Sequence, residues 1–341
     1  MINLVKLKDI AEELKLSVST VSRVVNNQDR VNPATRKKVQ EALQRHHYLP
    51  DENARRLKTN TSNVLGIIVP DISNPFYARV IKGIEHGVME RRYSLLLCNT
   101  DEDIVQEENA INLLMRQKVA GIIVATSARQ QLINALYGKT GCPVVFFDNV
   151  PQSSQPVYSV TINNAKATRD LVRYMCEKGH ERIYMITGPQ GESSADERLA
   201  GWRQALTGQG IIPEDTWYRF GDFREASGYR IMTEFLRQAK PPTAVCLANN
   251  FMAYGAIKAI EAAGLTVPDD LSIAAFDAAD ETGLMRLSIT TVVQPAEEIG
   301  LVSADLCLHA AQQRSSTKCQ KVILDHILLH NETVACPPES R

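Results

Sequence analysis

From residue 64 onward, short apolar runs alternate with stretches in which apolar residues recur at helical spacing. The first pattern predicts buried strands and the second predicts amphipathic helices. The predicted strands cover residues 64–70, 94–100, 121–126, 143–148, 182–188, 243–248 and 271–277. The predicted helices cover residues 75–92, 106–118, 130–138, 165–178, 195–207, 225–239 and 252–263. Because this alternation forms two successive series, we expect two similar α/β lobes with parallel sheets.

The first 50 residues follow a different pattern, that of three short helices. Residues 7–14 and 18–26 have apolar residues at helical spacing, and only residues 15–17 separate them. Ser17 can cap the second helix, and Asn32 followed by Pro33 is a typical start for a third. The tight joint between the first two helices predicts a helix-turn-helix.

The charge is distributed unevenly. The chain of 341 residues has a net charge of −1, but residues 1–62 hold 12 Lys and Arg against 7 Asp and Glu. A basic head on an acidic body predicts that the head contacts a polyanion. The polar side of the second helix carries Ser19, Thr20, Ser22, Arg23 and Asn26. Short hydrogen-bonding groups with one arginine suit the DNA major groove, although a small protein-binding domain is the alternative.

Composition excludes several classes of protein. With 44% hydrophobic and 23% charged residues, the chain is typical of a globular protein. We predict neither a membrane span nor a secretory signal, and therefore a cytoplasmic location. The 7 cysteines form no CxxC pair and are expected to be buried free thiols, so no metal site is predicted. Because GxGxxG, Walker A and HExxH motifs are absent, we expect no cofactor and no catalytic residues.

Polar residues follow several predicted strands. Polar residues stand directly after four of the apolar runs: Asp71, Asp148, Asn249–Asn250 and Asp277. Ligands of parallel sheets bind at the carboxyl ends of strands. Each residue alone is explained by a capped turn, but their recurrence at equivalent ends predicts a ligand site.

The head resembles a known family. Residues 5–11, 17–26, 31–36 and 47–50 resemble the DNA-binding head of the LacI/GalR family of bacterial repressors. The resemblance implies that Val18, Ser19 and Arg23 face base edges. It also implies that phosphates are contacted by Thr20, Ser22, Asn26 and Tyr48. Lys15 departs from the glycine usual in this turn and is expected to adopt a left-handed conformation.

A short hinge is predicted after Pro50. Residues 51–58 are too few for a stable isolated helix, and residues 59–63 are typical of a linker. One interpretation is a solvated connector. The family resemblance, which we favour, implies a helix that forms on operator DNA, with Leu57 wedged into the minor groove and Ala54 and Lys58 beside it.

The body resembles the effector domain of the same family, which is itself similar to periplasmic sugar-binding proteins. The motifs lie at residues 69–77, 145–149, 178–183, 197–202, 221–223 and 290–295. The resemblance implies that Arg198 and Asp277 bind the polar groups of the ligand, and that the Phe223 ring packs against its apolar face. The full candidate set is Asp71, Phe76, Asp148, Arg198, Phe223, Asn249 and Asp277. Glu192 stands where purine-binding members have arginine, which favours a neutral sugar.

The expected fold is an N-terminal all-α helix-turn-helix head followed by a two-lobed, periplasmic-binding-protein-like α/β domain. We expect the head at residues 1–50, the hinge and linker at 51–63, and the effector and dimerisation domain at 64–341. The family's chain crosses between its lobes three times. That topology implies an N-lobe of residues 64–163 and 293–320, and a C-lobe of residues 164–292 and 321–334.

The predicted function is sequence-specific transcriptional regulation, most simply repression of a carbohydrate-utilisation operon. We expect a homodimer on a pseudopalindromic operator, controlled by a sugar in the cleft. A nucleoside or purine, or a phosphorylated protein coeffector, is an alternative within the family. A sugar-binding protein without DNA function and an α/β enzyme are alternatives outside it. Departures near the pocket are Asn250, Ala278–Ala279 and the segment 286–289, which lacks the usual proline.

Overall fold

The computed structural model describes residues 5–25, 31–46, 48, 62–127, 137–151, 156–279, 287–312 and 319–337. The chain divides into two compact units, residues 1–61 and 62–341, which are described separately. Four predicted DNA-contact residues lie outside the described residues: Asn26, Ala54, Leu57 and Lys58. Most of the predicted helix at residues 130–138 also lies outside them.

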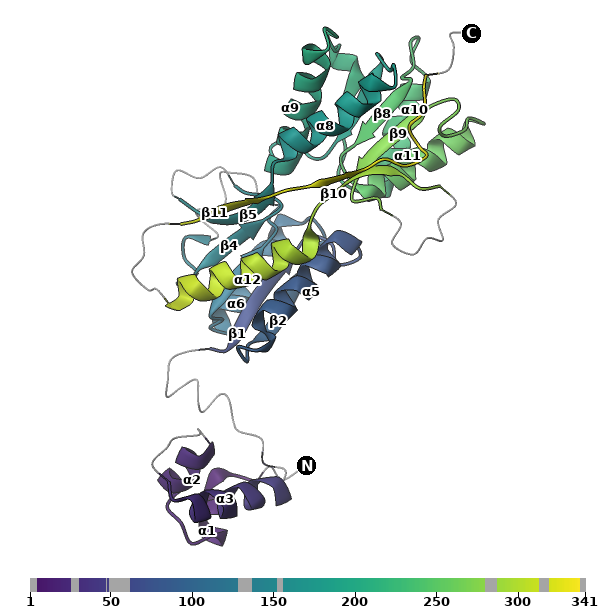
Figure 1. Cartoon of the computed structure of the whole chain (residues 1–341). Helices are drawn as coiled ribbons and strands as arrows, with labels where there is room; N and C mark the ends of the chain where they lie inside the picture. The colour runs from purple at the N-terminus through teal and green to yellow at the C-terminus, as the bar shows by residue number, and fades with distance from the viewer. Residues whose placement is uncertain are drawn as a thin grey trace. The chain divides into compact units, whose positions relative to one another are not determined.

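The described residues of the first unit form three helices, α1 (Leu7–Glu13), α2 (Val18–Val25) and α3 (Pro33–Arg45) (Figure 1). Their packed faces supply a small core of Ile10, Ala11, Val21, Val24, Val39 and Ala42. The predicted caps are confirmed, because Ser17 Oγ accepts from the Thr20 N–H at 3.2 Å and Asn32 Oδ1 accepts from the Ala34 N–H at 2.9 Å. Lys15 has the expected left-handed backbone, with φ of 54°.

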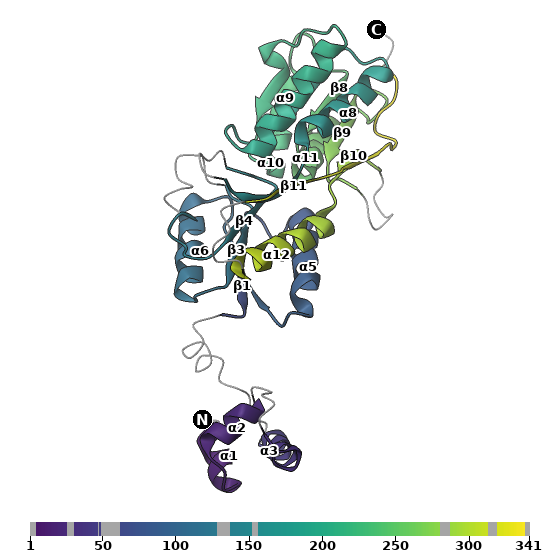
Figure 2. The same ribbon diagram turned by 60° about the vertical axis from the view of Figure 1, so that its left-hand side comes forward.

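The first sheet of the second unit forms its N-lobe. Its strands are β1 (Val64–Val69), β2 (Ser94–Asn99), β3 (Gly121–Val124), β4 (Val144–Phe147), β5 (Tyr158–Ile162) and β11 (Lys321–Leu324). All are parallel, in the order β11-β5-β4-β3-β1-β2. Helices α5 (Pro75–Met89) and α12 (Ala296–Gln312) cover one face, and α6 (Ile104–Arg116) covers the other (Figure 2). Apolar strands buried on both faces are typical of such a parallel sheet.

The second sheet forms the C-lobe and repeats this plan. Its strands are β6 (Ile183–Thr187), β7 (Tyr218–Phe220), β8 (Ala244–Leu247), β9 (Ser272–Phe276), β10 (Thr290–Val293) and β12 (Ile327–Leu329). Their order is β12-β10-β9-β8-β6-β7, with β12 antiparallel to β10. The helices are α8 (Asn164–Glu177), α9 (Ser193–Gly208), α10 (Glu225–Leu236) and α11 (Asn250–Ala262). Helix α8 packs on α9, and α10 packs on α11.

The predicted architecture is confirmed, and every predicted strand is present but is one or two residues shorter than predicted. The sequence analysis did not predict β5, β7, β10, β11, β12 or helix α12. Strand β11 shows why, because its four residues alternate between exposed and half-buried. An alternating run of only four residues does not distinguish a strand from a loop, and β11 is recognisable as a strand only from its pairing with β5.

The chain crosses between the lobes after β5, after β10 and between β11 and β12. The expectation that residues 321–334 lie wholly in the C-lobe is wrong for β11. Lys321–Leu324 pair in parallel with β5 and complete the edge of the N-lobe sheet. Only the segment from β12 onward joins the other sheet, where Thr333 and Val334 are buried.

Candidate functional site

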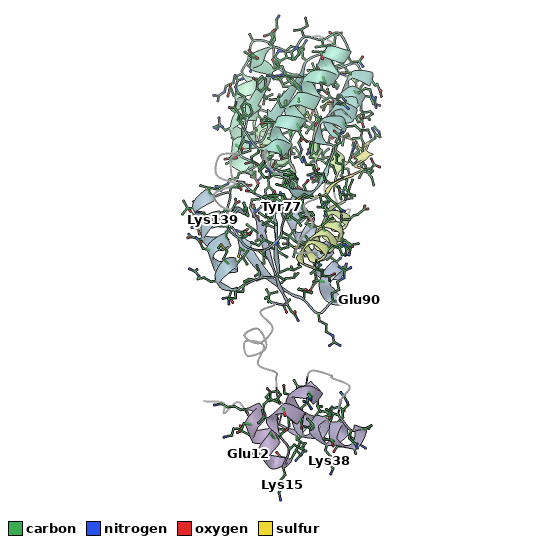
Figure 3. All side chains as sticks on the ribbon, turned by 90° about the vertical axis from the view of Figure 1, so that its left-hand side faces the viewer. Glu12, Lys15, Lys38, Tyr77, Glu90 and Lys139 are labelled. Carbon is green, nitrogen blue, oxygen red and sulfur yellow. The ribbon has the colours of Figure 1, made fainter. Side chains whose placement is uncertain are left out.

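A cavity of about 490 Å³ lies between the two lobes. Tyr77 lies near the junction of the lobes, whereas Glu90, just beyond the other end of α5, lies far from it (Figure 3). The structure brings together all seven residues predicted to bind a ligand, because each of them lines this cavity: Asp71, Phe76, Asp148, Arg198, Phe223, Asn249 and Asp277. These residues lie together because the carboxyl ends of the parallel strands in both sheets face the cleft.

Several of these residues have strained backbones. The described residues include eight non-glycine positions with positive φ, and five of them line the cavity: Asp101, Glu102, Asp148, Phe223 and Asp277. Their φ angles lie between 51° and 62°. A left-handed conformation costs a non-glycine residue about 1 kcal/mol or more, and such residues cluster where side chains must be aimed at a ligand.

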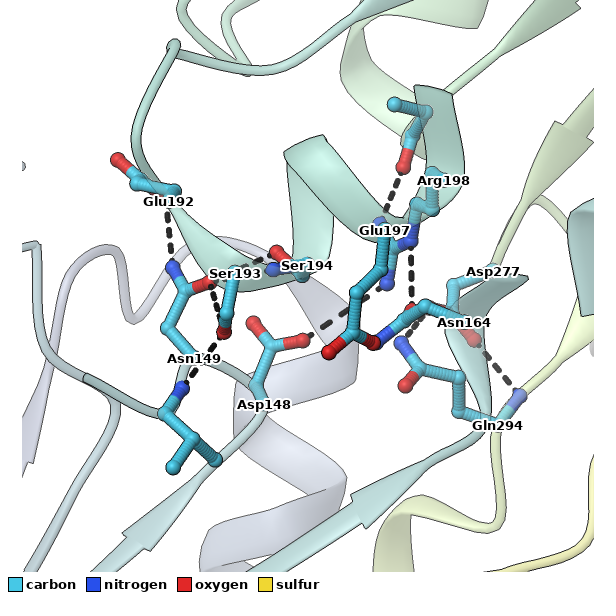
Figure 4. Close-up of polar contacts among 12 residues, drawn as sticks. Asp148, Asn149, Asn164, Glu192, Ser193, Ser194, Glu197, Arg198, Asp277 and Gln294 are labelled. Carbon is cyan, nitrogen blue, oxygen red and sulfur yellow. Dashed lines mark hydrogen bonds and ion pairs between the residues drawn. The ribbon is translucent and has the colours of Figure 1, made fainter. Parts of the chain in front are cut away.

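Arg198 is the most constrained side chain in the cavity. Its Nε donates to Asn164 Oδ1 at 2.9 Å, its Nη1 donates to the Ala248 carbonyl at 2.5 Å, and its guanidinium lies 4.1 Å from the centre of the Phe276 ring. Its Nη2 is buried without a hydrogen-bond partner in the described structure and lies 3.8 Å from Asp148 Oδ1 (Figure 4). A buried donor without an acceptor is costly, so this N–H is suited to a ligand oxygen.

Two aspartates face the cavity from opposite lobes. Asp148 Oδ2 accepts a hydrogen bond from the Tyr77 hydroxyl at 3.0 Å. Asp277 accepts from the Gln294 backbone N–H at 3.0 Å and from its Nε2 at 2.7 Å. Burial raises the pKa of Asp148 and the pKa of Asp277, although Arg198 opposes the rise in both. Both carboxylates would therefore gain from donors supplied by a ligand.

Asn249 and Asp71 also hold their own loops in place. Asn249 Oδ1 caps α11 through the Met252 N–H at 2.9 Å, and its Nδ2 donates to the Phe223 carbonyl at 2.7 Å. Asp71 Oδ1 accepts from the backbone N–H and the hydroxyl of Ser73. The turn-capping explanation is therefore correct for both, and it coexists with their place in the cavity wall.

Gly188 makes room for the Phe223 ring. A Cβ at residue 188 would lie 2.0 Å from Phe223 Cζ. No side chain larger than hydrogen fits there unless the ring moves. This glycine therefore positions the aromatic wall of the cavity.

Two adjacent residues in the loop after β4 have different roles: Asp148 lines the cavity, and Asn149 contacts the opposite lobe. Next to Asp148, Asn149 donates from Nδ2 to Glu192 Oε2 at 2.6 Å (Figure 4). Its Oδ1 accepts from the N–H and hydroxyl of Ser194 at the start of α9. Burial, together with the charge of Glu102, raises the pKa of Glu192 well above its usual value. Glu192 lines a neighbouring cavity of about 400 Å³, not the main one.

The sequence analysis missed several wall residues. Asn74 and Asn250, from opposite lobes, exchange amide hydrogen bonds at 3.3 Å in both directions. The sequence places Asn250 at a strand end beside Asn249 and as a departure from the family pattern, but not among the predicted ligand-binding residues, and Asn74 is recognisable in sequence only as the cap before Pro75. The other missed wall residues are Tyr77, Asp101, Glu102, Arg224, Glu225, Phe251 and Gln294.

The predicted DNA contacts lie on the first unit, where α2 turns Val21 and Val24 into the core. Val18 is 46% exposed at the start of this helix. Ser19 and Arg23 are exposed, whereas Thr20, Ser22 and Tyr48 are half-buried. Ser17 Oγ lies 2.8 Å from both the Ser19 and the Thr20 hydroxyls, so the start of α2 presents a cluster of linked hydroxyl groups.

Other candidate chemistry is limited. In the described part of the chain, no three His, Cys, Asp or Glu side chains converge as metal ligands would. Within that same part, no helix is long and apolar enough to cross a membrane. The seven cysteines are free, but the expectation that they are buried holds only for Cys246 and Cys307, and Cys336 is exposed.

Comparison with known proteins covers both units. Residues 62–329 match the family described as periplasmic binding proteins and sugar binding domain of LacI family. Residues 6–51 match the bacterial regulatory proteins of the lacI family.

Whole-chain relatives agree with these matches. Catabolite control protein A of Priestia megaterium is 34% identical over 304 residues, covering 89% of this chain and 91% of the relative. The HTH-type transcriptional repressor CytR of Escherichia coli K12 is 33% identical over 331 residues, covering 97% of each chain. A solved structure of the lac repressor dimer bound to operator and an anti-inducer has a TM-score of 0.86 at 28% identity, covering 97% of this chain and 99% of that one.

Proposed function

Since the chain belongs to the LacI family of bacterial regulatory proteins, we propose that it is a sequence-specific transcriptional repressor whose affinity for its operator is controlled by a small ligand in the interlobe cavity. The proposed target is a carbohydrate-utilisation operon. The protein acts as a homodimer in the cytoplasm, each protomer contacting one half of a pseudopalindromic operator.

One observation carries the ligand-binding part of this proposal. The Arg198 Nη2 group is buried in the cavity wall without a hydrogen-bond acceptor, while Asp148 and Asp277 face the same space. A hydroxyl group satisfies both demands, because its oxygen accepts from arginine and its proton is donated to a carboxylate. A hydroxyl-rich ligand such as a sugar fits this donor and acceptor pattern.

The charges of the wall argue against an anionic ligand. Six carboxylates and two guanidiniums line the cavity. A phosphate or carboxylate group would be repelled by most of its surroundings. One relative of known structure is a CelR regulator in complex with cellobiose, at 27% identity and a TM-score of 0.74. A neutral ligand of this class is compatible with the present cavity.

The proposal assigns DNA contacts to the first unit and the hinge. Val18, Ser19 and Arg23 contact base edges, and their exposure supports this role. Phosphates are contacted by Thr20, Ser22, Asn26 and Tyr48. Leu57 wedges into the minor groove beside Ala54 and Lys58. In this division the head covers residues 1–50, the hinge and linker 51–63, and the effector domain the remainder.

The ligand acts through the angle between the lobes. A ligand group bound at Asp148 shifts the loop that follows β4. The next residue in this loop, Asn149, is hydrogen-bonded to Glu192 and Ser194 at the start of α9 in the other lobe. The three crossing segments then transmit the change in angle to the start of β1, where the hinge residues attach. Coupling of about 1–3 kcal/mol between ligand and operator is typical of such regulators.

Operator binding tests the proposal directly. Fluorescence anisotropy with labelled DNA from upstream of the protein's own gene is expected to show tight binding that competitor DNA does not remove. Arg23→Ala is expected to cost about 1–3 kcal/mol of specific binding. Arg198→Ala is expected to keep operator binding and to lose the response to sugars or nucleosides. Failure of the native protein to bind any promoter fragment, with or without such metabolites, would contradict the proposal.

A further inference from the structure

Building on the proposed function, we propose that the ligand of the cavity is an amino sugar or a related amino alcohol, with its protonated amine held against Glu102. The inference concerns which ligand the same site selects. It rests on how the charges of the cavity wall are already paired.

Most carboxylates of the wall have partners within the protein. Glu225 Oε1 lies 2.5 Å from Lys258 Nζ. Asp277 is held by two donors of Gln294, and Asp148 lies between the Tyr77 hydroxyl and Arg198. These contacts offset the charge of three of the six carboxylates.

Of the other three, Asp71 accepts from the N–H and the hydroxyl of Ser73, and Asp101 is exposed and accepts from Asn99 Nδ2 at 2.6 Å. Glu102 combines burial with the fewest partners. Within the described residues it has a single hydrogen-bond donor, the Ser127 hydroxyl at 3.0 Å, and no cation within 4.0 Å. Arg224 is near enough to lower the pKa of Glu102, but its Nη2 donates to the Asp101 carbonyl at 2.8 Å and it forms no ion pair with Glu102 in the described structure. Glu102 is nevertheless half-buried and is held toward the cavity by a left-handed backbone with φ of 61°.

The surroundings of Glu102 increase its need for a cation. It also borders the neighbouring cavity of about 400 Å³, which Glu192 and Asp222 line as well. Burial, with smaller effects of Asp148 and Asp71, raises the pKa of Glu102 to about 7, although the Ser127 hydroxyl and Arg224 oppose the rise. A positively charged group beside Glu102 would favour its ionised form and relieve the repulsion among these carboxylates.

The ligand also needs a hydrogen-bond acceptor, because Arg198 Nη2 is buried without one in the described structure. An amine alone cannot satisfy Nη2, because a protonated amine has no acceptor. A hydroxyl oxygen on the same molecule can accept from Arg198 while the amine contacts Glu102. Both groups line one cavity of about 490 Å³, which lies within the range of small-molecule sites. Acceptor and cation together define an amino alcohol, and the excess of carboxylates excludes its phosphorylated form.

Matched pairs of sugars test the proposal on the full-length protein. Isothermal titration compares glucosamine with glucose, galactosamine with galactose and mannosamine with mannose, with N-acetylglucosamine and glucosamine 6-phosphate as uncharged and anionic probes. At least one amine is expected to bind at least about tenfold more tightly than its parent sugar, equivalent to about 1.4 kcal/mol. Glu102→Gln is expected to remove that advantage, so that each amine binds no more tightly than its parent sugar to the variant. Glu90→Gln, an exposed position beyond the far end of α5, is the matched control.

The proposal is overturned if no amine binds, if every amine is matched in affinity by its parent or acetylated sugar, or if the Glu102→Gln variant retains the preference. The proposed function survives any of these results when a neutral sugar or nucleoside binds with a requirement for Arg198 and alters operator affinity. Loss of operator binding by the native protein would instead contradict the proposed function itself.

Discussion

The Tyr77 hydroxyl donates to Asp148 Oδ2 at 3.0 Å and joins helix α5 to the end of strand β4 at the floor of the cavity. The tyrosine is buried, and burial together with the Asp148 charge raises its pKa well above its usual value. It therefore remains a hydrogen-bond donor at any ordinary pH.

Tyr77→Phe removes this donor and leaves the buried Asp148 carboxylate with Arg198, 3.8 Å away, as its remaining charged partner. A hydrogen bond to a charged group contributes about 1.5–3 kcal/mol, so we expect a loss of stability in that range. Ligand affinity should fall as well, since Asp148 becomes harder to ionise. Both tryptophans, Trp202 and Trp217, lie in the effector domain, so urea unfolding followed by tryptophan fluorescence measures this domain alone. An unchanged unfolding midpoint would show that the bond contributes nothing.

Gly188→Ala tests the aromatic wall of the cavity. The added methyl group would overlap the Phe223 ring, so the ring must leave its position. We expect ligand affinity to fall about tenfold or more, equivalent to about 1.4 kcal/mol, while operator binding without ligand is unchanged.

Gly208→Ala is the matched control for this change, because a Cβ at residue 208 meets nothing within 4 Å. It should leave ligand binding as it is and should not weaken α9. Titration of the tightest compound from the sugar panel provides the measurement. Equal affinities for the Gly188→Ala variant and the native protein would show that Phe223 is no part of the site.

Asn149→Asp tests whether the β4 loop couples the cavity to the opposite lobe. The change replaces the Nδ2 donor to Glu192 with a second carboxyl group, so the 2.6 Å hydrogen bond from residue 149 is lost and two acids are buried side by side. We expect ligand binding at Asp148 to persist, but the shift in operator affinity on ligand addition should fall from about 1–3 kcal/mol toward zero. Anisotropy titrations of operator DNA with and without ligand measure that shift. A full shift in the variant would place the coupling elsewhere.

The location of the site was predictable from the sequence, but its internal contacts were not. Asp71, Asp148, Asn249 and Asp277 follow apolar runs, and parallel topology alone directs such residues to one edge. The Asn74–Asn250 pair depends instead on how two lobes face each other across 176 residues, which no local pattern encodes. Glu102 likewise lacks an ion pair among the described residues because Arg224 donates to the Asp101 carbonyl, a contact that no local sequence pattern predicts.

The pH dependence of stability gives an independent view of Glu102. Burial raises its pKa from 4.5 to about 7. Because the folded state holds this proton more tightly, the contribution of Glu102 to stability is fully present below pH 4.5 and is lost as the pH rises through about 7. The loss is at most about 3 kcal/mol.

We therefore expect the native protein to lose stability relative to Glu102→Gln between about pH 4.5 and pH 7 and to change little above that, as measured by urea unfolding of the effector domain. Burial lowers the pKa of His180 and the pKa of His326, so these groups oppose the trend. Their effect is common to both proteins and cancels in the difference. If the difference in free energy of unfolding between the two proteins did not change with pH, the pKa of Glu102 would not be raised by folding.

Lys15 offers a test in the head, where it occupies the turn between α1 and α2 with φ of 54°. A left-handed lysine costs about 1 kcal/mol, and glycine removes that cost at some expense in unfolded-state entropy. Lys15→Gly is therefore expected to stabilise the helix-turn-helix by up to about 1 kcal/mol. The same substitution at Lys8, an exposed position within α1 that pairs with Glu12, should destabilise it by about as much. Hydrogen exchange of the α1 and α2 amides in the full-length protein measures both, and 1 kcal/mol corresponds to about a fivefold change in protection. Equal destabilisation by the two variants would mean that the turn around Lys15 is not strained.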